Sequence, residues 1–126
     1  MKNHLKFLTF FLMLVYLVSC GGVPNAAYIG NLSDLEIGMK IGNAIGKFSD
    51  EPEADLKFQV PGLDGEARVI TYNLISGDYV SDYFLVFLDN NLVYWGYPHE
   101  FARHDDPKIN KLGWIAVEKV YEQREE

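Results

Sequence analysis

Six consecutive apolar residues, Tyr83 to Leu88, constrain the fold of this chain more strongly than any other segment. Successive side chains of a strand point to opposite faces of its sheet, so a continuous apolar run is apolar on both faces. This pattern is typical of a central strand that is covered on both sides. We expect the strand to extend from Tyr79 to Leu88.

Three other segments show strand patterns. Residues 56–60 alternate apolar and polar side chains, which predicts a half-buried strand. β-branched residues predict a second strand over 67–75, and another is expected over 92–97. The sequence Asp89-Asn90-Asn91 suits a tight hairpin because Asn tolerates positive φ. Together with the central strand, these segments predict a four-stranded antiparallel meander.

Apolar residues at helical spacing flank the strands at both ends. Before them, Ser33 or Asp34 can cap a short helix that extends to Phe48, in which glycines lower the helix propensity. After them, a helix is expected over 107–124, with Asp105 or Asp106 as its cap. The sequence therefore predicts an α+β fold of two layers, with a short N-terminal helix, the meander and a C-terminal helix.

The N-terminal segment has the layout of an export signal. Lys2 and Lys6 precede an apolar run from Phe7 to Val18, which only Thr9 interrupts. A membrane-spanning helix needs about 20 apolar residues, so this run is too short for a permanent span. A basic start, a short apolar stretch and a small residue at the cleavage site predict a signal peptide.

The sequence Leu17-Val18-Ser19-Cys20 resembles the lipobox of bacterial lipoproteins. The resemblance implies cleavage after Ser19, a diacylglycerol on the thiol of Cys20, and an acyl chain such as palmitate on its amino group. Two or three acyl chains hold a protein firmly at a bilayer. The alternative is an ordinary secretory signal with a chance cysteine. By resemblance to sorting in enteric bacteria, Gly21 implies the outer membrane, with the folded part in the periplasm.

These features divide the chain into a signal peptide (1–19), a lipidated tether (20–32) and a single α+β domain (33–126). The part after Ser19 carries 9 basic and 18 acidic residues, a formal charge of −9. Binding to nucleic acid requires a basic stripe, so no such partner is expected. Because the charge also weakens adsorption to anionic lipid, the acyl chains must hold the protein at the membrane.

The order of elements resembles the SmpA/OmlA (BamE-like) family of lipoproteins. The resemblance rests on Gly38-Met39, the apolar helix after it, the acidic loop with Pro52, and the strand hairpin Phe87–Val93, and it covers residues 35–97. It implies the fold of the β-lactamase-inhibitor proteins. It also implies an outer-membrane lipoprotein that binds other proteins in barrel assembly or envelope maintenance, without catalysis.

The segment between the last strand and the last helix is the best candidate for chemistry. His99, Glu100, His104 and Asp105 carry metal-ligating groups. The histidines lie five apart, about 140° from each other on a helix, whereas a zincin motif places them four apart on one face. A polar loop is therefore the preferred interpretation, and no cofactor and no enzymatic activity are expected. The alternative is a metal-dependent or hydrolytic envelope enzyme.

Aromatic residues near the last strand give the better functional hypothesis. Tyr83, Tyr94, Trp95 and Tyr97 are of the types enriched in binding hot spots. Adjacent strand residues point to opposite faces, so only part of this set can be exposed together. The last strand is also a candidate sheet edge, which can pair with a partner strand. We therefore expect a lipid-anchored, non-catalytic module that binds an envelope protein.

Overall fold

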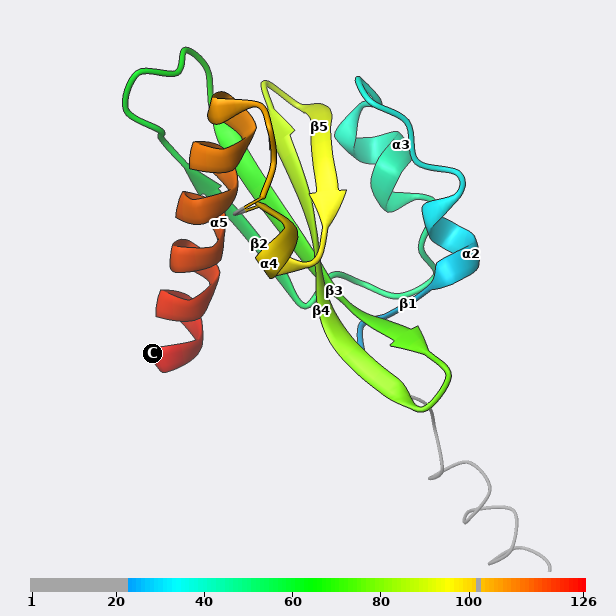
Figure 1. The fold of residues 1–126 in the computed structure, drawn as a ribbon. Helices are drawn as coiled ribbons and strands as arrows, with labels where there is room; N and C mark the ends of the chain where they lie inside the picture. Colours follow the sequence, from blue (N-terminus) through cyan, green and yellow to red (C-terminus); the bar gives the residue numbers. More distant parts are fainter. Residues whose placement is uncertain (1–22, 102) are drawn as a thin grey trace, which may run out of the picture.

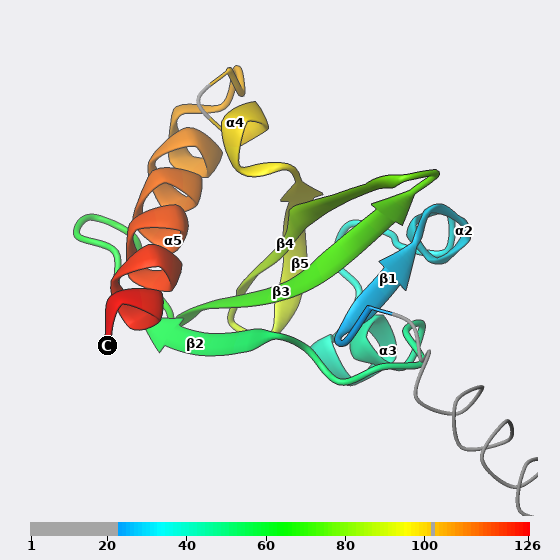
Figure 2. The ribbon, with the colours of Figure 1, turned by 90° about the horizontal axis from the view of Figure 1, so that it is seen from below.

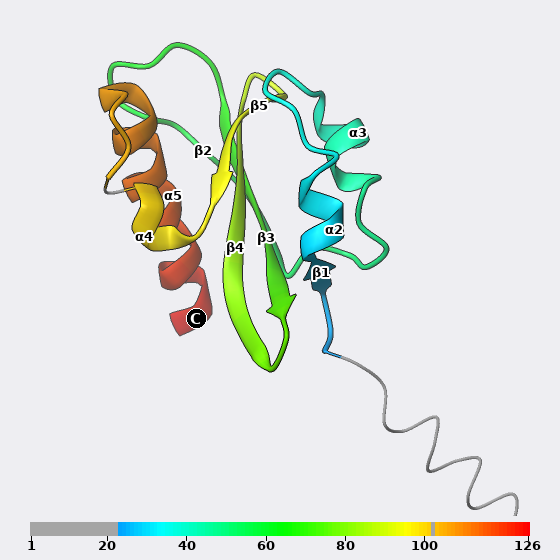
Figure 3. The same cartoon turned by 45° about the vertical axis from the view of Figure 1, so that its right-hand side comes forward.

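The structure is a computed structural model that describes residues 23–101 and 103–126. A five-stranded sheet lies between two layers of helices (Figures 1 and 3), which confirms the predicted α+β class. The strands are β1 (Ala26–Tyr28), β2 (Ala54–Phe58), β3 (Ala67–Ser76), β4 (Tyr79–Leu88) and β5 (Asn91–Gly96). The helices are α2 (Ile29–Leu32), α3 (Ile41–Ile45), α4 (Pro98–Phe101) and α5 (Pro107–Glu125).

The hairpin of β3 and β4 forms the centre of the sheet, whose main order is β1-β3-β4-β5. One edge of β3 is shared by two strands: β2 pairs with its first half in antiparallel fashion, and β1 pairs with residues 73–75 in parallel fashion. β5 pairs with the other edge of β4. Figure 2 shows β2 beside the beginning of β3 and β1 beside its end. The four predicted strands are therefore present as β2 to β5, and β1 is added to them.

Each face of the sheet has its own core, so the prediction of two layers is wrong. Tyr83, Leu85 and Phe87 of β4 pack on the side of α3, which we call the α3 face. Phe84 and Val86 pack on the opposite side, the α5 face, with residues of α4 and α5. The physical reason was present in the sequence, because a strand that is apolar on both faces requires cover on both.

Turn and cap residues behave as their chemistry predicts. Asp89 and Asn90 have φ values of 49° and 67°, the positive values that a two-residue hairpin loop needs. Asp106 caps α5, since its Oδ1 accepts a hydrogen bond of 2.9 Å from the backbone N–H of Lys108. Pro107 occupies the first turn, where its missing N–H costs nothing.

The segment before β2 differs most from the expectation. The predicted tether of 20–32 is too long, because residues 26–28 form β1 and α2 follows directly. The predicted helix up to Phe48 is reduced to α3. Gly38 has a φ of +86°, outside the helical region, and residues 38–41 instead bond to the start of β5. A tertiary pairing therefore replaces the first turns of that helix.

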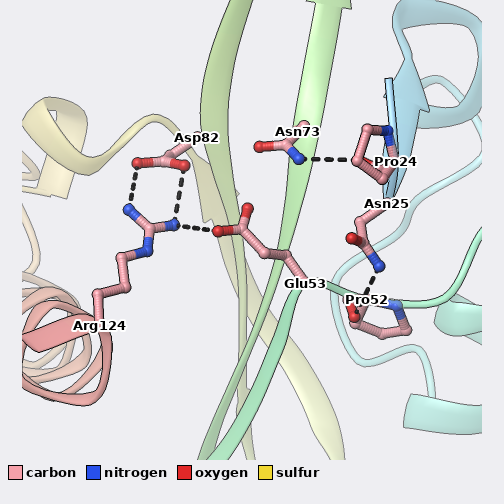
Figure 4. A network of polar contacts seen from close by, with 7 residues as sticks. All are labelled: Pro24, Asn25, Pro52, Glu53, Asn73, Asp82 and Arg124. Atoms are coloured by element: carbon pink, nitrogen blue, oxygen red, sulfur yellow. Dashed lines mark hydrogen bonds and ion pairs between the residues drawn. The ribbon is translucent and has the colours of Figure 1, made fainter. Parts of the chain in front are cut away.

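Polar side chains tie the outer elements to the sheet (Figure 4). The guanidinium of Arg124 in α5 donates to both carboxylate oxygens of Asp82, at 2.8 and 2.9 Å, and to Glu53 at 2.9 Å. On the β1 side, the amide of Asn73 donates to the carbonyl of Pro24 at 2.9 Å. The amide of Asn25 donates to the carbonyl of Glu51 at 2.8 Å. The beginning and the end of the described chain are thereby fixed to the sheet.

No helix within residues 23–101 and 103–126 is long and apolar enough to cross a membrane. The predicted signal peptide and Cys20 lie outside the described residues.

Candidate protein-binding site at the sheet edge

β5 is the outer strand at its side of the sheet, and its outer edge is only partly occupied. The N–H of Gly38 donates to the carbonyl of Leu92 at 2.7 Å, and the N–H of Leu92 donates to the carbonyl of Met39 at 2.8 Å. A third bond runs from the N–H of Ile41 to the carbonyl of Asn90 at 3.0 Å. Within the described chain these bonds occupy the outer edge of β5 as far as Leu92. The rest of that edge, from Val93 to Gly96, extends past the segment that makes them.

A bulge at Val93 redirects the side chains of β5. Phe87 pairs with Leu92 and Val86 pairs with Tyr94, which leaves Val93 as the extra residue. Val93 and Tyr94 consequently both pack on the α5 face, whereas Trp95 packs on the α3 face. The expectation that Tyr94 and Trp95 point to opposite faces is confirmed.

An apolar groove follows this edge, between the two helical layers. It has a volume of about 310 Å³. We call it the edge groove, and its lining residues are Ile37, Val93, Tyr94, Trp95, His104 and Ile109. A neighbouring hollow of about 190 Å³ shares Val93 and Ile109 with it and extends toward Leu63 and Leu112. The groove therefore lies where another strand would continue the sheet.

The wall of the edge groove on the α5 face is firmly held. The ring of Tyr94 packs against Phe101, with centroids 4.8 Å apart, and edge-on against His104 at 4.9 Å. Nδ1 of His104 accepts a hydrogen bond of 3.0 Å from the backbone N–H of Asp106. Burial and the nearby carboxylate of Glu100 raise the pKa of Tyr94, so this phenol stays neutral at physiological pH. These contacts hold the aromatic rings of this wall in place.

The other aromatic residues proposed for binding have different environments. Tyr83 is only 7% exposed, so the expectation that it contributes to an exposed surface is wrong. Its ring meets Tyr97 edge-on at 5.2 Å, and burial raises its pKa. Tyr97 is half-buried on the α3 face and stacks on His99 at 5.7 Å. Tyr83 and Tyr97 pack in the core of the α3 face, and neither lines the edge groove.

The candidate metal ligands do not converge. His99 stacks on Tyr97, whereas His104 packs against Tyr94 on the other side of the sheet. Glu100 lies near the hydroxyl of Tyr94, with an Oε2–OH distance of 3.4 Å. Among residues 23–101 and 103–126, no group of three His, Cys, Asp or Glu side chains is placed to hold a metal ion.

Sequence patterns identified only part of the edge groove. Tyr94 and Trp95 were proposed for binding from their residue type, and both line it. Ile37, Val93 and Ile109 were missed as site residues, because they come from three distant segments that only the fold brings together. Ile37 carried one usable signal, since it is a large apolar residue between Glu36 and Gly38, next to a backbone that must bend.

Comparison of the sequence with protein-family models and curated proteins, and of the structure with solved structures, found no match.

Proposed function

We propose that the chain is a lipid-anchored envelope protein that binds another protein at its edge groove, without catalysis. The predicted anchor is Cys20, and the predicted location is the periplasmic side of the outer membrane. The observation that carries the binding proposal is the apolar groove beside the outer edge of β5.

The occupant that best fits the edge groove is an extended segment of a partner protein. A strand added to a sheet edge gains main-chain hydrogen bonds, and its alternating side chains enter pockets on either side. Here Trp95 and Ile37 contribute one wall, and Tyr94 and Ile109 contribute the other. The partner segment is therefore expected to carry apolar residues rather than charged ones, since the groove walls offer apolar area.

The test is capture of the partner by matched variants of the lipidated protein. Ile37→Lys places a charge in the edge groove at a side chain that is 68% exposed, so the fold tolerates it. Trp114→Lys makes the same kind of change at a side chain that is 57% exposed on α5 and does not line the groove. We expect the first variant to lose the proteins that the natural chain captures from membranes, and the second to retain them.

Photo-crosslinking strengthens the comparison because it reports contact rather than co-purification. A photoreactive residue at position 37 is expected to join a partner that the same residue at position 114 does not. Capture that is equal for both variants, or lost equally in both, would contradict the groove as the binding site.

A further inference from the structure

The tip of the β3–β4 hairpin exposes large apolar side chains to solvent. Tyr79 is 79% exposed and Val80 is 51% exposed. Across the sheet, Val80 pairs with Ile75, and Ile75 pairs with the half-exposed Tyr28 of β1. The tip extends beyond the helices of both layers (Figures 1 and 3). Apolar surface is therefore presented where neither helical layer covers it.

The apolar residues lie on both faces of this tip. Leu74 packs in the core of the α3 face, so its neighbour Ile75 and the paired Val80 point to the α5 face. Tyr79 is adjacent to Val80 and points the opposite way. A protein partner that docks on a sheet covers one face, whereas a bilayer surrounds a projecting hairpin on all sides. The two-sided pattern favours lipid as the occupant.

The described chain begins at the same end of the molecule (Figure 3). Val23 is the first described residue, and the carbonyl of Pro24 is bound to Asn73, three residues from the end of β3. Cys20 precedes Val23 by three residues, which span at most about 10 Å when fully extended. A bilayer that holds an acylated Cys20 is therefore close to this end of the sheet.

We propose that the tip of the β3–β4 hairpin inserts into the lipid interface as a second membrane contact, and this rests on the proposed lipidation of Cys20. Tyr79 and Val80 reach the boundary between headgroups and acyl chains, the level at which tyrosine is favoured in membrane proteins. The carboxylate of Asp78 in the turn stays among the headgroups and limits the depth. The charge of −9 after Ser19 favours zwitterionic lipid over anionic lipid.

The experiment uses the mature lipidated protein in phosphatidylcholine vesicles, with a nitroxide on a single added cysteine. Tyr79→Cys and Val80→Cys probe the two faces of the tip, and both positions are exposed enough to accept the label. Ile37→Cys is the matched control, an exposed apolar residue beside the start of β5 at the other end of β4. The ratio of collision with oxygen to collision with a water-soluble nickel chelate reports immersion in lipid.

We expect this ratio to be several-fold higher at positions 79 and 80 than at position 37. A ratio at position 79 or position 80 that equals the ratio at position 37 overturns the inference. The protein without an added cysteine separates this failure from failure of the anchor. If its Cys20 accepts the label, the thiol is free, and the proposed lipidation and this inference fall together.

Discussion

Gly113 allows α4 to pack against α5. It is buried in the second turn of α5, and a Cβ at this position would collide with the ring of Phe101. Phe101 also contacts Tyr94 and Phe84, so its ring links the helices to the wall of the edge groove. A residue without a side chain thus fixes the position of an aromatic cluster.

Gly113→Ala is expected to lower the free energy of unfolding by about 1–3 kcal/mol, the usual cost of overpacking. The change also brings a helix-propensity gain of about 1 kcal/mol, which does not offset the displacement of Phe101. Gly42→Ala in α3 is the control, because a Cβ there meets nothing within 4 Å and should stabilise slightly. Urea denaturation measures both. Equal stability gains in the two variants would show that the Phe101 ring moves aside without cost.

Tyr72 predicts a loss of stability in alkaline solution. Burial raises its pKa to about 12, so folded protein retains this proton when unfolded chains begin to lose it near pH 10. The stabilisation is complete below pH 10 and is lost as the pH rises from 10 to 12, by at most about 1.4 kcal/mol per pH unit. Tyr83, whose pKa is also raised by burial, adds to the effect.

The Tyr72→Phe variant isolates this contribution. The described residues offer its hydroxyl no hydrogen-bond partner, so its removal should change stability by less than about 1 kcal/mol at pH 7. We expect the free energy of unfolding of this variant to fall less between pH 9 and 11.5 than that of the natural chain. Parallel pH profiles would show that Tyr72 ionises equally readily in the folded and unfolded states.

At the scale of elements, α5 is attached to the sheet differently at its two ends. Its first half packs by Leu112 and Gly113 against Phe101 and the α5 face. Its last turn is held by Arg124, which binds Asp82 of β4 and Glu53 next to β2. Apolar burial continues along the helix to Val120, so only the turn after Val120 depends on charge.

Arg124→Gln is expected to increase amide hydrogen exchange in the last turn of α5, after Val120. The cost in global stability should be about 1 kcal/mol or less, because the pair is partly exposed to solvent. Lys119→Gln is the control, since the contact of Lys119 within the described residues is an exposed one of 3.8 Å with Glu122, one turn away. Exchange that rises equally in both variants would mean that Arg124 does not fix the helix end.

The sequence predicted those elements whose signal is local. Alternation of polar and apolar residues identified β2, β-branched residues identified β3, and a continuous apolar run identified β4. A strand was also expected at β5, and periodic apolar residues with Asp106 and Pro107 identified α5. β1 was missed because three residues, Ala-Ala-Tyr, carry no alternation, and their pairing partner lies 47 positions later in β3. The helix before β2 was overextended because spacing alone does not reveal that Gly38 binds β5.

The same distinction applies to the edge groove. Residue type alone selected Tyr94 and Trp95, but exposure depends on tertiary packing, which buried Tyr83. His104 was considered as a metal ligand, and its ring instead forms part of an aromatic wall. The bulge at Val93 could not be predicted, since it arises from register against β4 rather than from the sequence of β5 itself.

At the scale of the whole molecule, the two ends of the central hairpin have different surroundings. The tip of β3 and β4 lies near the start of the described chain, whereas the β4–β5 turn lies toward the other end (Figure 3). The edge groove follows residues 93–95 of β5, on the side of that turn. A protein held at Cys20 would thus direct the edge groove away from the bilayer, toward partners in the aqueous compartment.

The Cys20→Ala variant is expected to be lost from the membrane fraction when the membranes are washed with high salt. The reason is that the acidic folded part has no electrostatic attraction to anionic lipid, and the hairpin tip offers only a small apolar contact. The measurement is fractionation of cells that express either the natural chain or the Cys20→Ala variant, with Ser19 unchanged in both. Membrane attachment that survives in the variant would show that another segment anchors the chain.

The parallel pairing of β1 with β3 has a mechanical consequence. A force that pulls on Val23 acts along β1 and loads its bonds to residues 73–75 together, in shear. The contacts of Asn25 with the loop before β2, and of Asn73 with Pro24, share this load. A force on the proposed anchor at Cys20 would therefore turn the whole sheet as one body. It would also change the position of the far end of the molecule.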